Sequence, residues 1–560
     1  MAPKKKRAAS PTSQAPAPKV QRKKGKAELA AEQADPSAAV ESSNKLADVN
    51  DSKRLNIPVD ELCPLANYRV WIDHDDGVIY DASLNQTAAG KNANKFYRIQ
   101  LLESPKGDYK TFTRWGRVGE RGQSATLGSG SLEDAMKNFE KKFKEKAGLT
   151  WADRLNDPKP GKYAFVERSY LPDSEDDEPQ AKEGAAASER RNRSVSPPKC
   201  TLAPPVKSLM ELIFNESYFD AAMVNLNYDL NKLPLGKLSK STITRGFQAL
   251  KTLSECLNNP SRAGECEQYS DLYYSLIPHA FGRNRPPVIR STDLLKREIE
   301  LLENLSDLKA ADDILKAEDE DGAEQIHQLD FRFRSLGLQE MTALTPDSKE
   351  YSEINQYLTK TCGETHTHVS YQVQDIFRIE RQGELDQFEN SCFSKISSDR
   401  RLLWHGSRAT NYGGILSQGL RIAPPEAPVS GYMFGKGVYL ADMSSKSANY
   451  CVPYISNGEG LLLLCEAELG DPMQVLTEAD YDAGEKAKAK GLWSTHGVGM
   501  TAPKGWKDAS AIHPSLAGVR MPDTEEPPED VDGSAYLLYN EYICYDVAQI
   551  RLRYMLRVRM

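Results

Sequence analysis

The sequence predicts a multidomain protein: a disordered basic N-terminus, an α+β domain, an all-α helical bundle, and a second α+β domain built on antiparallel sheets. Three observations predict this order. At 560 residues the chain has room for roughly three or four domains. Residues 1–60 are rich in Ala, Pro, Ser and Lys and lack aromatic residues, so they cannot bury a core. Beyond residue 60, apolar residues recur at every second position, as in strands. Near residue 206 their spacing becomes that of a helix, and near residue 338 it returns to every second position.

The net charge of −8 is unevenly distributed along the chain. Residues 1–26 hold nine Lys or Arg and no acid, and residues 91–170 hold 17 basic against 10 acidic residues. Two basic regions on an otherwise acidic chain indicate a polyanionic partner for the N-terminal half. The clusters "PKKKR" (3–7) and "QRKKGK" (21–26) predict a bipartite nuclear localisation signal, although a nucleic-acid-binding tail would have the same composition.

The nine Cys residues are scattered, and no two form a CxxC pair. This argues against zinc fingers and for free thiols in a reducing compartment. His366 and His368 could offer a two-point metal site, but without a third ligand nearby a structural role is favoured. We therefore expect no metal. We also expect no membrane partner, because no apolar run approaches the ~20 residues that span a bilayer.

The first ordered domain is expected at residues 61–170. Strand patterns separated by Gly-containing turns occur at 65–73, 95–104 and 109–123. Residues 131–148 have the pattern of an amphipathic helix, which Gly148 is placed to end. Residues 171–205, with acidic, basic, Pro and Ser residues, are predicted to be a linker.

The helical bundle is expected at residues 206–337 and the second α+β domain at 338–560. Helical spacing of apolar residues occurs in 209–226, 242–257 and 292–318. One apolar stripe of the third helix is formed by Leu295, Ile299, Leu302, Leu305 and Leu308. Strand patterns of the last domain occur at 368–381, 400–407, 460–470, 536–546 and 549–560. The last strand alternates apolar residues inward with four Arg outward.

The strand pattern 536–546 carries an unusual carboxylate. Side-chain alternation puts Glu541 on the same face as Tyr539 and Ile543, where an unpaired charge is costly. The acid is either satisfied by a structural partner or catalytic.

Two further stretches of the last domain carry candidate chemistry. His405 ends an apolar strand, and Gly406 beside it lets a ligand approach the backbone. Ser447 and Tyr450 are three residues apart, so a short helix presents a hydroxyl and a ring side by side. The sequence has no P-loop, no GxGxxG after a strand, no GxSxG and no HExxH. This set lacks a nucleophile–base pair and suits a substrate that already carries a good leaving group.

The stretches "LLWHGSR" (402–408), "GYMFGKGVYLADMSSKSANYC" (431–451) and "LLYNEYICYDVAQIRLRYML" (537–556) closely resemble the catalytic domain of DNA-dependent poly(ADP-ribose) polymerases. "YKTFTRWGRVGERGQ" (109–123) resembles the WGR domain of that family, and the helical segment resembles its autoinhibitory helical domain. The resemblance spans roughly residues 65–170 and 206–560. The architecture is similar to the short, zinc-finger-less members.

The resemblance implies NAD⁺ as substrate and catalytic roles for His405, Tyr439, Lys446 and Glu541. In this interpretation Glu541 binds the nicotinamide-ribose 2′-OH and orients the acceptor, while Lys446 lies near the reacting ribose. His405 bonds the adenine-side ribose, Tyr450 stacks on the nicotinamide ring and Tyr439 closes the pocket. Gly406 clamps the carboxamide with help from the Ser447 hydroxyl. The full NAD⁺-binding set implied is His405, Gly406, Ser407, Asn411, Arg421, Tyr432, Tyr439, Ser447, Tyr450 and Glu541.

The resemblance also implies partners and regulation. DNA strand breaks are expected to meet Lys95, Arg114, Trp115, Arg117 and Arg121, with Trp115 stacking and the cations contacting phosphates. A core Trp with a solvated basic face is the alternative. Acceptors are expected to be proteins such as histones and the enzyme itself, and an accessory specificity factor is possible.

The helical domain is expected to block NAD⁺ until DNA binds, with Glu300, Glu303 and Asp307 near the pocket, although a solvated acidic face explains these acids equally well. His496, in the long segment 470–534, is expected near the acceptor. Two other functions stay open: a mono-ADP-ribosyltransferase, and a DNA-end-binding scaffold with an inactive transferase domain. The retained Glu541 and His405 favour the polymerase.

Overall fold

The computed structural model describes residues 57–168, 170, 199–226, 228, 238–316, 326–366, 369–531, 533 and 535–560. The expected tail therefore lies almost wholly outside the described residues, as do most of the linker and His368. Among the helices that are described, none is both long and apolar enough to cross a membrane.

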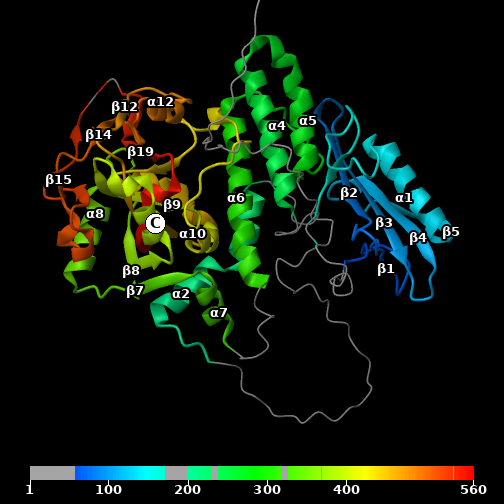
Figure 1. The fold of residues 1–560 in the computed structure, drawn as a ribbon, viewed down its shortest axis with the longest axis horizontal. Coiled ribbons are helices and arrows are strands. Elements are labelled where there is room, and N and C mark those ends of the chain that lie inside the picture. Colours follow the sequence, from blue (N-terminus) through cyan, green and yellow to red (C-terminus); the bar gives the residue numbers. More distant parts are fainter. Residues whose placement is uncertain are drawn as a thin grey trace, which may run out of the picture. The chain divides into compact units, whose positions relative to one another are not determined.

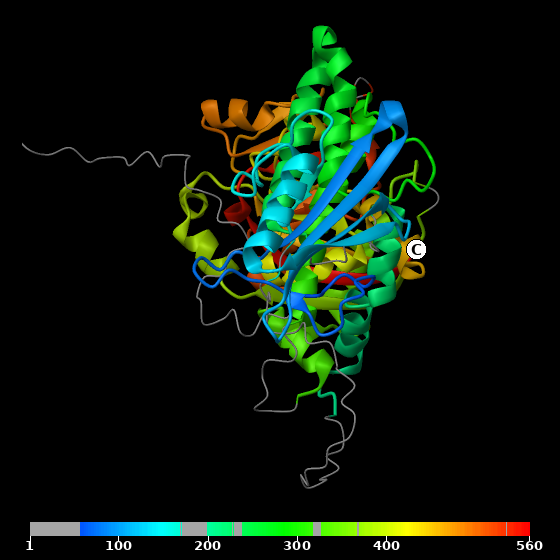
Figure 2. The ribbon, with the colours of Figure 1, turned by 90° about the vertical axis from the view of Figure 1, so that its right-hand side faces the viewer.

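The N-terminal domain is one antiparallel sheet covered by a helix. Its strands are β1 (Arg69–Val70), β2 (Asp81–Ala88), β3 (Ala93–Glu103), β4 (Tyr109–Arg117), β5 (Gln123–Gly130) and β6 (Ala164–Val166). They follow the order β5-β4-β3-β2-β6, and β1 pairs with β3. The helix α1 (Leu132–Ala147) packs on β3, β4 and β5, as Figures 1 and 2 show. This confirms the expected α+β domain, with β2, β5 and β6 added to the strands expected from the sequence.

The predicted helix 131–148 is confirmed together with its end signals. The Ser131 side chain accepts the N–H of Asp134, which satisfies one of the free donors at the start of the helix. Gly148 has φ +75°, a left-handed conformation that glycine adopts without strain, and its N–H donates to the carbonyl of Lys144. The buried residues Phe139 and Phe143 face the sheet.

The described residues of the helical domain form α2 (Pro204–Ile213), α3 (Glu216–Asn225), α4 (Lys240–Asn258), α5 (Cys266–Leu276), α6 (Thr292–Lys316) and α7 (Gln328–Ser335). The helix α4 packs against both α5 and α6 (Figure 1). The expected apolar stripe of α6 is buried at all five positions.

The expected single helix over 209–226 is wrong, because the chain forms two helices there. The first ends at Ile213, and the Asn215 side chain accepts the N–H of Tyr218 to start the second. Asn favours such a cap over a helix interior, so a continuous hydrophobic pattern hid the break.

The C-terminal domain contains two main sheets and a small third one. The seven-stranded sheet has the order β15-β16-β9-β11-β20-β8-β7. Its strands are β7 (Leu338–Ala343), β8 (Gln372–Arg381), β9 (Arg400–Ser407), β11 (Glu459–Glu468), β15 (Trp506–Asp508), β16 (Arg520–Pro522) and β20 (Ile550–Arg559). The second sheet has the order β10-β19-β13-β12, formed by β10 (Val438–Leu440), β19 (Glu541–Cys544), β13 (Ser494–Gly497) and β12 (Gln474–Leu476).

The third sheet is formed by β17 (Glu529–Asp530), β14 (Gly499–Ala502) and β18 (Leu537–Tyr539). Most pairings in the domain are antiparallel, as expected, but β12–β13, β14–β18 and β16–β9 are parallel. The domain also contains α8 (Lys349–Lys360), α9 (Glu384–Asn390), α10 (Tyr412–Gln418), α11 (Ser444–Ala448) and α12 (Ala483–Ala489).

Two expectations for the C-terminal strands need correction. The four Arg of β20 do not all face solvent: the strand lies between β11 and β8, and of its four Arg only Arg559 is exposed. Arg553 is buried and its Nη1 lies 2.5 Å from a carboxylate oxygen of Glu466. The predicted strand 536–546 is also broken: β18 ends at Tyr539 and β19 begins at Glu541, in a different sheet. The break falls at Asn540, whose side-chain oxygen accepts the N–H of Gly499.

Candidate active site

Strand β9 positions the first part of the candidate site. The Nδ1–H of His405 donates to the carbonyl of Tyr439 on β10, at 3.0 Å, which leaves Nε2 as the free acceptor of a neutral ring. Burial lowers the pKa of His405, so the imidazole is neutral at pH 7. The β9–β10 contact continues through the backbone pair Trp404–Ala441.

Gly406 is required by close packing rather than by backbone conformation. A Cβ at this position would lie 2.0 Å from the carbonyl oxygen of Ser447 on α11. The Ser447 hydroxyl donates to the carbonyl of Trp404 at 3.1 Å. Tyr450, just after α11, exposes 61% of its surface, so its ring is open to a flat ligand.

Lys446 is the partner that Glu541 needs. The ammonium nitrogen lies 3.0 Å from a Glu541 carboxylate oxygen and donates to the carbonyl of Tyr539 at 2.7 Å. Both side chains are largely buried, with 14% and 12% exposed. Burial lowers the pKa of Lys446 and the Glu541 charge opposes that shift. The carboxylate on the apolar strand is therefore paired and oriented.

Strand β10 carries Tyr439 and joins β19 in antiparallel register. The Tyr439 hydroxyl accepts the N–H of Phe434 at 2.9 Å and donates to the carbonyl of Gly435 at 2.8 Å. The hydroxyl thus holds the preceding loop in place.

A buried polar network lies behind Glu541, and sequence reasoning missed it. Asp442, which follows β10, is fully buried and accepts from the Asn540 amide at 2.8 Å and the Tyr542 hydroxyl at 3.0 Å. Arg401 donates to the same hydroxyl at 3.0 Å. Asn540 and Tyr542 flank Glu541 in sequence, so the network fixes the backbone that carries it. A polar residue next to an apolar strand, as in "YLADM", is the only sequence signal for it.

His496 was expected near the acceptor and lies on β13, beside β19. It pairs in register with Tyr542, and its ring stacks on that side chain with centroids 4.6 Å apart. The next residue, Gly497, pairs with Glu541. Burial lowers the pKa of His496.

Helix α6 contacts the candidate NAD⁺-binding set directly. Asn411 donates to the side-chain oxygen of Asn304 at 2.7 Å, Tyr432 donates to Glu303, and Arg421 is paired with Asp307. A fourth contact joins Arg408 to Glu300 at 2.8 Å. The three acids expected near the pocket are therefore bonded to the C-terminal domain, although Glu300 still exposes 51% of its side chain.

Close backbone packing accompanies these bonds. A Cβ at Gly413 would lie 2.8 Å from the Cβ of Ala311, and one at Gly414 would lie 2.8 Å from the Asp307 carbonyl oxygen. The two glycines of α10 thus let the helix approach α6 closely.

The basic residues expected to meet DNA divide into two groups. Lys95 and Arg121 are exposed. Arg114 is buried and lies 2.8 Å from Asp60, so the structure contradicts a phosphate contact for it. Trp115 is half-buried and stacks on Tyr97 with ring centroids 5.7 Å apart. This arrangement matches the alternative in which the Trp packs on the core.

Arg117 points to a different role, because its guanidinium joins two domains. It donates to the carbonyls of Gly282 at 2.8 Å and Asn284 at 3.4 Å, and to the carbonyl of Asn92 at 2.9 Å. Gly282 and Asn284 belong to the helical domain. These two acceptors could not be identified from the sequence, because they lie far from Arg117 along the chain.

His366 has side-chain partners of its own. One ring nitrogen is 2.9 Å from the Ser445 hydroxyl, and the other is 3.2 Å from the Asn449 amide. This supports the structural role expected for it.

Comparisons with known proteins agree on one family. Residues 348–560 match the model of the poly(ADP-ribose) polymerase catalytic domain, residues 200–333 the poly(ADP-ribose) polymerase regulatory domain, and residues 80–158 the WGR domain.

Curated relatives match along most of the chain. The chain is 42% identical to poly [ADP-ribose] polymerase 2-A of Oryza sativa subsp. japonica, over 88% of this chain and 71% of the relative. It is 38% identical to poly [ADP-ribose] polymerase 2 of Homo sapiens, over 90% and 83% of the two chains. It is 37% identical to poly [ADP-ribose] polymerase 1 of Gallus gallus, over 86% of this chain and 45% of that relative. Three matched domains and these relatives show that the chain belongs to the poly(ADP-ribose) polymerase family, whose enzymes use NAD⁺ as substrate.

Proposed function

We propose that this protein responds to DNA strand breaks in the nucleus by building ADP-ribose polymers from NAD⁺ on proteins, itself included. Family membership supports the reaction, and the two basic clusters of the tail support the location. The observation that carries the proposal is the Lys446–Glu541 pair, which presents an oriented carboxylate beside the β9 and β10 residues of the candidate site.

The chemistry follows from the leaving group of NAD⁺. Nicotinamide departs as a neutral molecule, and C1′ of its ribose develops oxocarbenium character as in glycoside cleavage. The Glu541 carboxylate stabilises that charge and accepts a proton from the incoming hydroxyl. Lys446 orients the carboxylate. The acceptor is first a protein side chain and then the 2′-OH of an attached ADP-ribose unit. The protein groups account for these steps without a metal.

The proposed regulation depends on the contacts that helix α6 makes with the candidate NAD⁺-binding residues. Three residues of the implied NAD⁺ set, Asn411, Arg421 and Tyr432, are bonded to α6 side chains. In the proposal this is a closed state, and DNA binding shifts the population towards one in which α6 is displaced.

The path from DNA to α6 runs through the contact between the WGR and helical domains. The Ala89 N–H donates to Asp271 at 2.7 Å, and Arg285 donates to the Ala89 carbonyl at 2.6 Å. With Arg117, these bonds connect the part of the WGR domain that carries the exposed Lys95 to α5 and to the loop that leads from α5 into α6.

The decisive experiment supplies NAD⁺ to the purified protein with and without a 5′-phosphorylated DNA break. Polymer that forms only or mainly with the break is the expected result. If DNA did not stimulate ADP-ribosylation, the proposal would be wrong. If only single ADP-ribose units formed, the protein would be a mono-ADP-ribosyltransferase.

Glu541→Gln separates polymer growth from NAD⁺ cleavage. The amide keeps the shape of the side chain but removes the charge that orients and activates the acceptor hydroxyl. We expect a loss of elongation of at least about 100-fold, the usual lower range for general-base removal. Gel analysis of chain length measures this, and long chains from the variant would refute the role of Glu541.

A further inference from the structure

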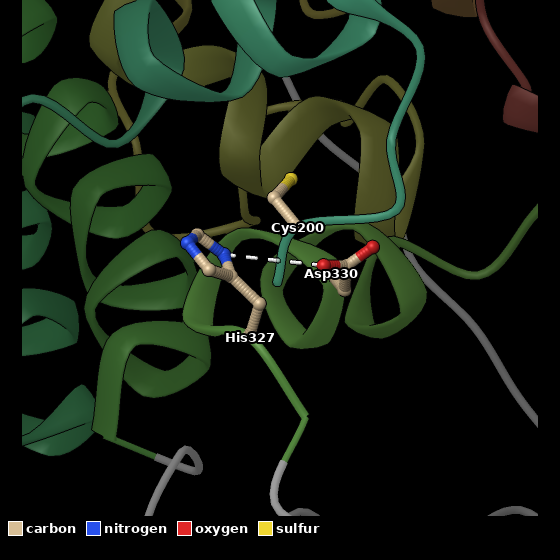
Figure 3. Close-up of side chains that lie close together, drawn as sticks. All are labelled: Cys200, His327 and Asp330. Carbon is tan, nitrogen blue, oxygen red and sulfur yellow. Dashed lines mark ion pairs between the residues drawn. The ribbon is translucent and has the colours of Figure 1, made fainter. Parts of the chain in front are cut away.

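Cys200, His327 and Asp330 bring three different metal-ligating groups together outside the candidate active site. A thiol sulfur, an imidazole nitrogen and a carboxylate oxygen all lie within 4.8 Å of one another. Figure 3 shows the three side chains close together. Cys200 precedes α2, and the other two residues stand at the start of α7. These positions are the two ends of the matched regulatory domain, residues 200–333.

The carboxylate of this cluster is held in place by neighbouring groups. Asp330 is buried, and its two oxygens accept the Thr201 N–H at 3.0 and 3.1 Å; the Thr201 hydroxyl also donates to it. One Asp330 oxygen lies 3.9 Å from Nδ1 of His327. Hydrogen bonds of this kind orient carboxylate ligands around metals in proteins.

The other two groups are open to exchange with solvent. Cys200 and His327 are half-buried, and Cys200 is a free thiol. His327 also caps α7, because its Nδ1 accepts the N–H of Leu329 at 3.1 Å. A neutral imidazole has one unprotonated nitrogen, so a bound ion takes the place of this hydrogen bond. An ion can therefore reach the cluster without unfolding the domain.

The chemistry of the donors selects the ion. Ca²⁺ and Mg²⁺ prefer oxygen ligands throughout, whereas a sulfur, a nitrogen and an oxygen together suit Zn²⁺. We propose that Cys200, His327 and Asp330 bind one Zn²⁺, with water as the fourth ligand, and that the ion clips the first residues of the helical domain to its last helix. The thiolate and the carboxylate balance the two charges of the ion, and the thiol proton is released to solvent on binding.

The clip would act on a part of the fold that links two domains. Helix α7 packs against α2 and leads into β7, the first strand of the catalytic sheet. Joining chain segments that are distant in sequence reduces the entropy of the opened state, so the bound ion disfavours local opening of α7.

The test uses the full-length chain after treatment with a chelator. Titration with Co²⁺ is expected to show one equivalent bound with a thiolate-to-cobalt charge-transfer band, which Zn²⁺ then removes. Zn²⁺ is also expected to slow hydrogen exchange over residues 326–336. Absence of a thiolate–cobalt band would overturn the proposal.

Matched variants distinguish the cluster from adventitious binding. Cys200→Ser and His327→Asn are expected to weaken Zn²⁺ binding by at least about tenfold, and Thr201→Val by about tenfold through the lost hydroxyl. Asn preserves the helix cap that His327 supplies, so the fold is kept.

The control variants replace the same residue types elsewhere. Cys392→Ser removes an exposed thiol, and His513→Asn replaces a second His whose Nδ1 caps a short helical turn by accepting the Ser515 N–H. Both are expected to bind Zn²⁺ like the parent. Equal affinity in the Cys200→Ser and His327→Asn variants would refute the clip.

Discussion

At the scale of single residues, the site depends on how two buried carboxylates are satisfied. Glu541 is paired with Lys446, and Asp442 accepts two hydrogen bonds from the residues on either side of Glu541. The first carboxylate is placed to act on a substrate, and the second to position the first. Burial raises the pKa of Asp442, which the hydrogen bonds and the nearby cations oppose.

Asp442→Ala is expected to reduce both stability and elongation. The amide of Asn540 and the hydroxyl of Tyr542 would lose their acceptor, at a cost of about 1–3 kcal/mol for each buried group left unsatisfied. Asp442→Asn keeps one acceptor oxygen and should recover most of the loss. Thermal unfolding and chain-length analysis of the two variants provide the comparison, and equal behaviour of Ala and Asn variants would contradict the positioning role.

At the scale of elements, α6 is the part on which regulation depends. Three polar contacts and the close α6–α10 approach hold residues of the implied NAD⁺ set, and a fourth polar contact holds Arg408. One of the contacts titrates near neutral pH. Burial raises the pKa of Glu303 from 4.5 to about 7, and the charge of Glu300 adds to this, whereas Tyr432 and Arg421 oppose it.

The docked state of α6 should therefore weaken as the pH rises. The pKa of Glu303 is higher in the docked state, so its contribution is complete below about pH 4.5 and is lost as the pH passes about 7. We expect DNA-independent activity to increase between about pH 4.5 and 7 and to level off above that range. In Glu303→Gln, which stays neutral and can still accept from Tyr432, that increase should be several-fold smaller.

Glu300→Gln is the matched control on the same helix. It weakens the pair with Arg408 and should raise DNA-independent activity at every pH. Because the Glu300 charge helps to raise the pKa of Glu303, the increase with pH should remain but begin at a slightly lower pH. The measurement is the activity without DNA at each pH, divided by the activity with DNA at the same pH. The same slope in the parent and in Glu303→Gln would rule out Glu303 as the titrating group.

At the scale of the whole chain, the basic residues of the WGR domain have separate tasks. Lys95 and Arg121 are exposed, whereas Arg117 spans the contact with the helical domain. Binding of DNA and transmission of the signal are therefore separable by mutation.

Arg117→Ala is expected to uncouple DNA binding from activation. Loss of the bonds to Gly282 and Asn284 should reduce DNA-stimulated activity by about tenfold, which corresponds to about 1.4 kcal/mol of coupling free energy between the two domains. The affinity for DNA should change little. Fluorescence anisotropy and activity assays on the same preparation test this. If the loss of DNA affinity accounted for the whole loss of activity, Arg117 would instead be a residue that contacts DNA phosphates.

The double variant Lys95→Ala with Arg121→Ala should show the opposite behaviour. We expect weaker DNA binding and a salt dependence whose slope falls by about one unit for each phosphate that is no longer neutralised by a side chain. Arg69→Ala serves as the control, because Arg69 lies on β1, beside the far end of β3, where it pairs with Glu103. An unchanged salt slope in the double variant would exclude these residues from the DNA interface.

Much of the architecture was predictable because its signals are local. The end signals of α1, the buried stripe of α6 and strand β9 all follow from short-range patterns of apolar and capping residues. The break at Asn215 and the break at Asn540 were not predictable, because each depends on a hydrogen bond that the linear pattern does not display.

The sequence by itself determined the domain order, the strand end that carries His405 and Gly406, and the presence of a carboxylate that needs a partner. Only the tertiary structure decided what that partner is, that Arg114 is buried while Arg117 joins two domains, and that Cys200 meets α7. The physical reason is the same in each case. Charges and metal ligands act over a few ångströms, and the groups that come within that range are set by the packing of segments far apart along the chain.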